Sequence, residues 1–366
     1  MSWFAVSNID TIDTPALLVY AERVKENIRL LTTMVKDITQ LRPHVKTNKM
    51  AEVCSMMMDA GITKFKCATI AEAEMLAMIN APDILLAYQP IGPKVQRLIH
   101  LVKNYPNSHF SCLVDNETSA RFIAGQFAAN GLQISLFIDL DVGMRRTGIQ
   151  IRDAFQLAQS IQQLPNIQLE GLHLYDGHIT DTDLQVRQQK ADAAFSAVLL
   201  LLQKINSELG ASLKIVAGGS PSFPTHLLRQ NVECSPGTFV FWDYGYKHSF
   251  PDEPFDYAAL VVTRVISIID EHTLCLDLGH KSVGAENPLP RVHFLNAPEL
   301  VPFSQSEEHM VVKSGHPNAF KHGDVLYGVP VHICPTVALY ERAWVVENGN
   351  VTDEWKVVAR NRYINI

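Results

Sequence analysis

The sequence predicts a parallel (β/α)8 barrel followed by a smaller, mostly antiparallel β-domain. Between about residues 15 and 240, short apolar or β-branched runs alternate with segments whose apolar residues recur at helical spacing. Repeated β-α units of this kind form parallel sheets with right-handed crossovers, and eight of them close a barrel. After about residue 245 the runs are β-rich and separated by turn residues, which indicates antiparallel strands.

Each predicted barrel strand is a short run that precedes a helical pattern. The runs lie at residues 15–20, 41–46, 64–69, 83–89, 109–114, 135–142, 169–176 and 213–218. Among the helices between them, one is expected to begin after Asn116, which suits an N-cap, and to stop near Gly131. A doubly wound parallel sheet fits the same alternation, and the pattern alone does not separate the two folds. A linker is expected at residues 248–256.

Composition excludes several classes of protein. Of the 366 residues, 47% are hydrophobic and 19% charged, which fits a globular protein with a sizeable core and excludes disorder or a coiled coil. The net charge of −7 argues against a nucleic-acid partner. The six cysteines form no CxxC pair, no apolar run is long enough for a membrane span, and the first residues do not resemble a signal peptide. A reducing cytoplasm is the expected location.

Three cation-capable residues alternate along LRPHVK, residues 41–46. If this run is a strand, Arg42, His44 and Lys46 share one face. Inside a barrel such charges are costly unless an anion or a covalent partner balances them. Burial and nearby positive charge lower the pKa of a lysine, which makes its amine a nucleophile able to form a Schiff base. Lys46 would lie at the strand end where barrel active sites are built. An edge strand with its charges in solvent fits the same residues equally well.

Two glycine-containing loops follow late strands and precede short helical patterns. The first holds Gly218, Gly219 and Ser220, and the second holds Gly237 and Thr238. Glycine lets backbone N–H groups approach a phosphate, and a hydroxyl adds a donor. Late loops of a barrel are the usual place for a phosphate site. Either loop alone is also what an ordinary turn looks like.

Polar side chains also end two central strands. In GLHLYDGHI (171–179), His173, Tyr175 and Gly177 share one face. In DLDVGMRRTG (139–148), a glycine-bounded loop presents Arg145 and Arg146. An arginine there can hydrogen-bond a cofactor hydroxyl or a substrate carboxylate, although most arginines are surface charges.

Metal-ligand chemistry is concentrated in VPVHICPTV, residues 329–337. His332 and Cys334 would share a strand face, and imidazole nitrogen and thiolate sulfur are zinc-type ligands. Two ligands can form an open site completed by water or substrate. A buried cysteine beside a hydrogen-bonded histidine is the alternative. The cluster SEEH (306–309) fits either an acid–base role or a solvated turn.

Taken in order, these motifs resemble those of the fold-type III pyridoxal-phosphate (PLP) enzymes, which have an alanine racemase-like barrel. Within that group the chain resembles the D-threonine aldolase and D-serine dehydratase branch. The matching motifs are DTPALLVY, LRPHVKTNK, KCATIAEAEML, DVGMRRTG, LHLYDGH, AGGSP, SPGTFVFWD, DLGHKS, SEEH and HICPT, from about residue 10 to residue 340.

The resemblance implies a role for each candidate residue. It implies that Lys46 carries PLP as an internal aldimine, with Tyr175 and His44 as the other catalytic residues. It implies a divalent metal on His332 and Cys334. The soft sulfur ligand favours zinc, with Mn²⁺ or Mg²⁺ as alternatives. The cofactor contacts implied are Lys46, Gln89, Arg146, Tyr175, Gly218, Gly219, Ser220, Gly237 and Thr238.

The resemblance also implies the domain plan and the assembly. Residues 12–246 are expected to form the PLP-binding barrel, and residues 247–366, joined by 1–11, the β-rich domain. In relatives the N-terminal strand belongs to that second domain and two subunits complete the sites, so a homodimer is expected. The expected partner is a small amino-acid substrate, with neither nucleic acid nor membrane.

The expected activity is that of a PLP- and metal-dependent lyase on β-hydroxy D-amino acids. A PLP-dependent amino-acid racemase and a non-catalytic PLP-binding protein are the alternatives. The family pattern after the lysine is usually Thr-His-Lys, whereas this chain has Thr47, Asn48 and Lys49. Asn48 can act neither as an acid–base group nor as a cation, which leaves the preferred substrate open.

Overall fold

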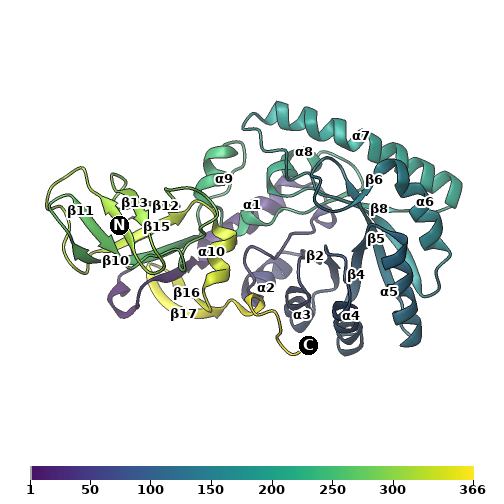
Figure 1. The fold of residues 1–366 in the computed structure, drawn as a ribbon, viewed down its shortest axis with the longest axis horizontal. Helices are drawn as coiled ribbons and strands as arrows, with labels where there is room; N and C mark the ends of the chain where they lie inside the picture. Colours follow the sequence, from purple (N-terminus) through teal and green to yellow (C-terminus); the bar gives the residue numbers. More distant parts are fainter. Residues whose placement is uncertain (1) are drawn as a thin grey trace. The chain divides into compact units, whose positions relative to one another are not determined.

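The structure is a computed structural model that describes residues 2–366 and divides them into two compact units (Figure 1). The β unit comprises the chain up to Leu31, Thr47–Met56 and Thr238–Arg360. The barrel unit comprises Thr32–Lys46, Met57–Gly237 and Asn361–Ile366. Each unit is therefore discontinuous in sequence, and the predicted domain boundary after residue 246 stays a prediction.

The barrel unit holds a parallel sheet in the order β2-β3-β4-β5-β7-β8-β9, with β6 paired to β5. The strands are β2 (Lys64–Cys67), β3 (Asp83–Leu86), β4 (His109–Val114), β5 (Ile134–Asp141), β6 (Ile149–Gln150), β7 (Ile167–Leu174), β8 (Lys214–Ala217) and β9 (Val232–Cys234). Four buried side chains from four of these strands, Leu85, Leu113, Phe137 and Val216, form a core cluster. The predicted α/β barrel is confirmed.

Residues 41–45 join the two ends of this sheet without forming a regular strand. Leu41 forms a parallel bridge to Cys234 of β9, and His44 forms one to Lys66 of β2. The N–H of Val45 also donates to the carbonyl of Lys66 at 2.9 Å. Pro43 lacks a donor, which is one reason why the ladder here is reduced to isolated bridges.

Helices flank the outer side of the parallel strands (Figure 1). They are α3 (Ile70–Met78), α4 (Pro93–Asn104), α5 (Glu117–Ala129), α6 (Ile151–Gln162), α7 (Leu184–Leu209) and α8 (Phe223–His226), with the 3-10 turns η2 (Ile38–Gln40) and η3 (Ser220–Ser222). The predicted N-cap is confirmed, because the Asn116 side chain accepts from the Ser119 N–H at 2.8 Å. The predicted stop also holds, since α5 ends at Ala129 and Gly131 has a φ of 66°.

The β unit is built on a second sheet in the order β13-β14-β11-β10-β1-β16-β17, with β15 joining β10 to β12. The strands are β1 (Ala16–Tyr20), β10 (Ala259–Ile268), β11 (Thr273–Leu276), β12 (Val292–Phe294), β13 (Val301–Gln305), β14 (Met310–Lys313), β15 (Val325–Pro330), β16 (Arg342–Glu347) and β17 (Asn350–Lys356). All pairings are antiparallel except the one between β1 and β16. The predicted antiparallel domain is confirmed.

The pattern predicts that residues 15–20 form the first barrel strand, and this prediction is wrong. Residues 15–20 form β1, which pairs with β10 and β16, and the barrel takes β9 in its place. Every residue of β1 is buried, so its apolar pattern fits a strand of either sheet equally well. The family resemblance implied this exchange, and on that point it is confirmed.

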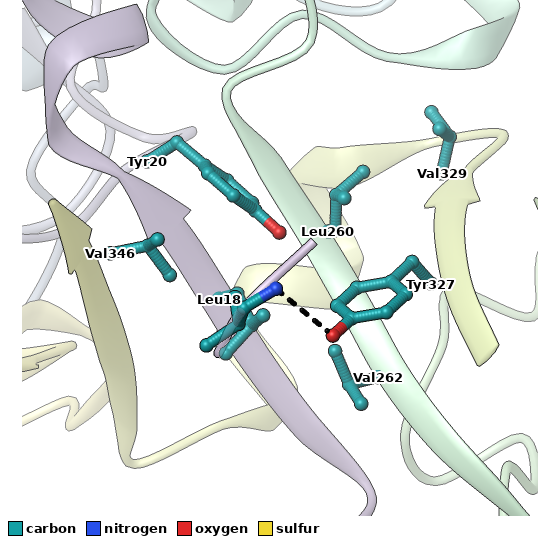
Figure 2. Packing of buried hydrophobic residues seen from close by; sticks show 8 residues of the cluster. Leu18, Tyr20, Leu260, Val262, Tyr327, Val329 and Val346 are labelled. Atoms are coloured by element: carbon teal, nitrogen blue, oxygen red, sulfur yellow. Dashed lines mark hydrogen bonds between the residues drawn. The ribbon is translucent and has the colours of Figure 1, made fainter. Parts of the chain in front are cut away.

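A core cluster explains why β1 belongs with the later strands. Leu18 and Tyr20 of β1 pack with buried side chains of β10, β15 and β16 (Figure 2). The Val6 N–H donates to the Tyr327 hydroxyl at 3.3 Å, which ties the N-terminal segment to β15. The first residues therefore gain their buried partners from the far end of the chain.

Short helices complete the β unit. They are η1 (Ile9–Thr11), η4 (Thr238–Val240), α9 (Tyr244–Ser249), α10 (Ile333–Leu339) and η5 (Val358–Arg360), while α1 (Ala21–Met34) and α2 (Ala51–Asp59) each run through a division between the units. The predicted linker at 248–256 is a packed part of this unit, because Phe250 and Phe255 are buried. Across residues 2–366, no helix has the length and apolar character needed to cross a membrane.

Candidate functional site

The barrel part of the candidate site gathers around the ring of Tyr175, directly after β7. The Nζ atoms of Lys46 and Lys66 each lie 5.9 Å from the centroid of this ring, and the guanidinium carbon of Arg146 lies 4.9 Å from it. Within residues 2–366 none of these three cations forms an ion pair with a carboxylate. Three cation-capable side chains around one ring, none of them hydrogen-bonded to a carboxylate in the described chain, provide a site for an anion.

Behind Tyr175 a buried chain of hydrogen bonds orients His173. The Thr147 hydroxyl donates to Asp139 Oδ2 at 2.8 Å, and Asp139 Oδ1 lies 2.7 Å from His173 Nδ1. Burial lowers the pKa of His173, and the nearby Lys66 and Arg146 lower it further against the opposing effect of Asp139. Asp139 thus orients the imidazole through Nδ1, and Nε2 lies toward Lys66.

Lys66 is the lysine that the barrel buries. Its exposed fraction is 2%, and its Nζ lies 3.5 Å from His173 Nε2 and 3.3 Å from the carbonyl oxygen of Gly218. Burial and the charge of Lys46 lower the pKa of Lys66 to about 7. The sequence argument expected such an environment at Lys46, which is instead exposed. Lys66 was missed, although KFKC places it on the same strand face as Lys64.

The first glycine loop has the shape of a phosphate cradle. Gly218 has a φ of 71°, and a Cβ there would lie 2.6 Å from Ser222 Oγ. A Cβ on Gly219 would lie 3.0 Å from the ring of Tyr175. The Gly237 N–H donates to Ser220 Oγ at 3.2 Å, which brings the two predicted loops together within the barrel unit. A backbone this close to its neighbours, beside three cations, suits the phosphate of PLP.

A second buried network supports that loop. Ser222 Oγ donates to Asp176 Oδ1 at 2.6 Å, and His226 Nε2 lies 2.7 Å from Asp176 Oδ2. All three side chains are buried. Sequence reasoning did not single out Asp176, Ser222 or His226, and only the position of Asp176 next to Tyr175 hinted at a role.

Two of the predicted site residues in the barrel, His44 and Gln89, accept hydrogen bonds from neighbouring residues. His44 is half-buried and its Nδ1 accepts from the N–H of Lys46 at 3.2 Å. Gln89 Oε1 accepts from the Asp115 N–H at 3.0 Å and from Asn116 Nδ2 at 3.2 Å. Their catalytic and cofactor roles stay predictions.

Arg42 does not join the other cations. Its guanidinium is fully buried, with Nη1 2.7 Å from Asp83 Oδ1 and Nε 2.6 Å from Glu233 Oε2. These two acids supply the negative charge that the sequence argument required of a ligand. Arg42 therefore links β3 and β9 through two ion pairs. The expectation that all three alternating cations face one ligand is wrong.

The metal part of the candidate site lies in the β unit. His332 is the N-cap of α10, and Cys334 lies in its first turn, so the expectation that both share a strand face is wrong. The strand β15 ends at Pro330, and Pro335 suits the first turn of the helix that follows. Cys334 Sγ lies 3.1 Å from Thr47 Oγ1 and 3.7 Å from Thr238 Oγ1.

His332 is oriented from its other side by a carboxylate. Its Nδ1 lies 2.5 Å from Glu286 Oε1. Burial alone would lower the pKa of His332, but the sulfur of Cys334 and the carboxylates of Asp243 and Glu286 raise it to about 9. Burial raises the pKa of Asp243 to about 6, although its carboxylate accepts from the Ile333 N–H at 3.0 Å.

The donor set fits a soft divalent metal with open coordination positions. A ligating histidine usually gives its second ring N–H to a carboxylate, as His332 does to Glu286, and Cys334 supplies the sulfur. In residues 2–366 no cluster unites three or more His, Cys, Asp or Glu side chains suited to a metal. Any metal here would take its remaining ligands from water or substrate.

The remaining predicted features lie in the β unit. Asn48 is buried, and its Oδ1 accepts from the Met50 N–H at 3.0 Å. The SEEH cluster is an exposed turn in which Glu307 and Glu308 pair with Lys281 at 2.5 and 3.1 Å. SEEH therefore has the geometry of a solvated turn.

Comparison with known families agrees with this fold and its motifs. Residues 19–244 match the model "Alanine racemase, N-terminal domain", and residues 258–346 match "Putative serine dehydratase domain". The chain belongs to the alanine racemase N-terminal domain family, and the resemblance drawn from its motifs is confirmed.

Individual relatives span nearly the whole chain. The D-threonine aldolase of Arthrobacter sp. is 27% identical over 95% of this chain and 93% of its own length. The crystal structure of D-threonine aldolase from Filomicrobium marinum superposes with a TM-score of 0.89 at 23% identity, covering 98% of each chain. D-threo-3-hydroxyaspartate dehydratase from Delftia sp. HT23 superposes with a TM-score of 0.80 at 22% identity, covering 94% and 97% of the two chains. A cysteine-to-alanine variant of D-threo-3-hydroxyaspartate dehydratase is described as metal-free, and a histidine-to-alanine variant is also known.

Proposed function

We propose that the protein is a PLP- and metal-dependent lyase that acts on β-hydroxy D-amino acids, by dehydration or by retro-aldol cleavage. The observation that carries the proposal is the set of three cationic side chains around Tyr175, beside a glycine loop whose backbone packs closely against Ser222 and the Tyr175 ring. Relatives named as aldolases and as dehydratases support the substrate class.

Different residues of the barrel unit would bind different parts of the cofactor. Lys46 is the exposed amine beside Tyr175 and would hold PLP covalently, while Gly218, Gly219, Ser220 and Gly237 would hold its phosphate. Bound PLP supplies an electron sink that stabilises negative charge at the substrate Cα. Arg146 adds a fixed positive charge on the same ring of Tyr175.

The β unit would supply the metal, on His332 and Cys334. A divalent metal there supplies a Lewis acid for the substrate β-hydroxyl. The soft sulfur ligand favours zinc over Mn²⁺ or Mg²⁺.

The chain's own bases then decide the outcome. If the amine of Lys46 takes the proton from Cα, the β-hydroxyl leaves as water and an amino acid is dehydrated. If a base instead removes the proton of the β-hydroxyl, the Cα–Cβ bond breaks and an aldehyde leaves. His173 is held through Nδ1 by Asp139 and supports the site from within the barrel.

One incubation tests the proposal and separates its two branches. Purified protein would be supplied with PLP and zinc, given D-threonine, and its products identified by NMR. 2-Oxobutanoate and ammonia would indicate dehydration, and glycine with acetaldehyde would indicate retro-aldol cleavage. Production of L-allo-threonine, the Cα epimer of D-threonine, in a reaction insensitive to chelator would favour a racemase instead.

Failure to convert D-threonine, D-serine and 3-hydroxy-D-aspartate would leave a PLP-binding protein without lyase activity and refute the proposal. The homodimer implied by the family belongs to the proposal as well. Light scattering coupled to gel filtration would test it, because a monomer would exclude sites completed by two subunits.

A further inference from the structure

Lys66 lies inside the barrel, and the reaction outlined above does not use it. Its ammonium has three N–H donors, and two of them are accounted for by His173 Nε2 at 3.5 Å and the Gly218 carbonyl at 3.3 Å. Neither partner carries a negative charge. With an exposed fraction of 2%, the charge has almost no access to water.

The nearest acids are already engaged elsewhere. Asp139 is bound to His173 and Thr147, and Asp176 is bound to Ser222 and His226. Neither carboxylate forms an ion pair with Lys66. Asp139 and Asp176 favour the charged form of Lys66 only from a distance, while burial and the charge of Lys46 oppose it. A buried ammonium without a direct carboxylate partner is costly, and Arg146 lies close by on the same ring.

The missing negative charge points to the cofactor. Lys66 contacts the loop that we assign to the phosphate, and it flanks the same aromatic ring as Lys46 at the same distance of 5.9 Å. Lys46 is exposed and open to a covalent partner, whereas Lys66 is held by two hydrogen bonds. The two lysines are therefore suited to different tasks.

We propose that Lys66 is a positioning residue for the anionic cofactor, which it binds through charge without a covalent bond while it holds the carbonyl of Gly218. This inference rests on the proposed function, because it requires a phosphate-bearing cofactor in the barrel. It also predicts a trade-off between stability and cofactor binding. Without cofactor the buried charge of Lys66 lowers the stability of the barrel unit, and the bound anion offsets that cost.

The experiment compares Lys66→Met with Lys64→Met. Methionine keeps most of the length of lysine and removes the charge. Lys64 lies two residues earlier on the same strand face, where it pairs with Glu233 at 2.5 Å, and serves as the matched control. For each protein we would measure the Kd for PLP by absorbance titration and the stability without PLP by urea unfolding. Borohydride reduction followed by peptide mass spectrometry would then locate the pyridoxyl group.

Lys66→Met should raise the Kd for PLP by about tenfold to a hundredfold, as expected for loss of one charged hydrogen-bonding group. Lys64→Met should leave that Kd unchanged, and Lys66→Arg should restore part of the affinity. Without PLP, the Lys66→Met protein should be at least as stable as the wild type, because methionine relieves the buried charge. The pyridoxyl group should be found on Lys46 in every variant that binds PLP.

Three results would overturn the inference. They are a Kd for Lys66→Met within twofold of the wild type, a loss of stability without PLP in that variant, and a pyridoxyl group on Lys66. The second would assign Lys66 a purely structural role. If the wild type itself takes up no PLP, the proposed function fails, and the inference falls with it. If the wild type and Lys66→Met both bind PLP tightly, the inference is wrong while the proposed function stands.

Discussion

Substitution of Gly218 tests whether the first glycine loop is shaped by its neighbours or only by its own backbone. At a φ of 71°, alanine costs about 1–2 kcal/mol of folding free energy at any position. At Gly218 the added Cβ would also lie 2.6 Å from Ser222 Oγ and 2.7 Å from His226 Cδ2. Ser222 would have to leave Asp176, and loss of a hydrogen bond to a charged group adds about 1.5–3 kcal/mol.

Gly210 provides a matched control. It has a φ of 62°, and a Cβ there would meet nothing within 4 Å. Gly210→Ala should therefore show the backbone cost alone, and Gly218→Ala should be less stable than this control by about 1.5–3 kcal/mol in urea unfolding. The Kd for PLP should rise only in Gly218→Ala. Equal losses of stability in the two variants would refute the assignment of Ser222 and His226 as the neighbours that shape the loop.

Three further changes test other parts of the molecule. Lys46→Ala should abolish the borohydride-reducible bond to PLP, and a surviving bond would point to Lys66, which lies as close to Tyr175. Cys334→Ala should lower the zinc bound per chain in elemental analysis without lowering PLP content, and unchanged zinc would remove Cys334 from the metal site. Although burial opposes it, His109 and Lys214 lower the pKa of Glu170 to about 2, so this carboxylate stabilises the fold above its unfolded pKa and loses that effect as the pH falls toward 2. Glu170→Gln should cost about 2–3 kcal/mol in urea unfolding at pH 7 and much less near pH 3, and a constant difference between the two pH values would contradict this linkage.

The candidate site shows how far residue patterns reach. Gly218, Gly219, Ser220 and Gly237 could be paired from sequence, because two glycine loops after late barrel strands match the usual place of a phosphate site, although either loop alone also fits an ordinary turn. Their support by Asp176 could not, since its partner His226 lies 50 residues later and only the folded loop brings the two side chains to 2.7 Å.

The lysines show the limit more sharply. Alternation along LRPHVK placed Arg42, His44 and Lys46 on one face, but alternation does not tell which end of a strand is buried or which acids lie across from it. Asp83 and Glu233 come from strands far away in the chain, and they neutralise Arg42 before any ligand is needed.

By itself the sequence determined a parallel α/β domain and an antiparallel β-domain, because period and turn residues are local properties of the chain. Its ordered motifs determined the family, and the family resemblance then favoured the barrel over a doubly wound sheet. Only the tertiary structure decided that β1 leaves the barrel for the second sheet, that Cys334 begins a helix, and that Lys66 is the buried lysine. Each of these depends on which distant residues come into contact. A fully apolar strand or a lone lysine carries no local mark of its partners, and burial is set by those partners alone.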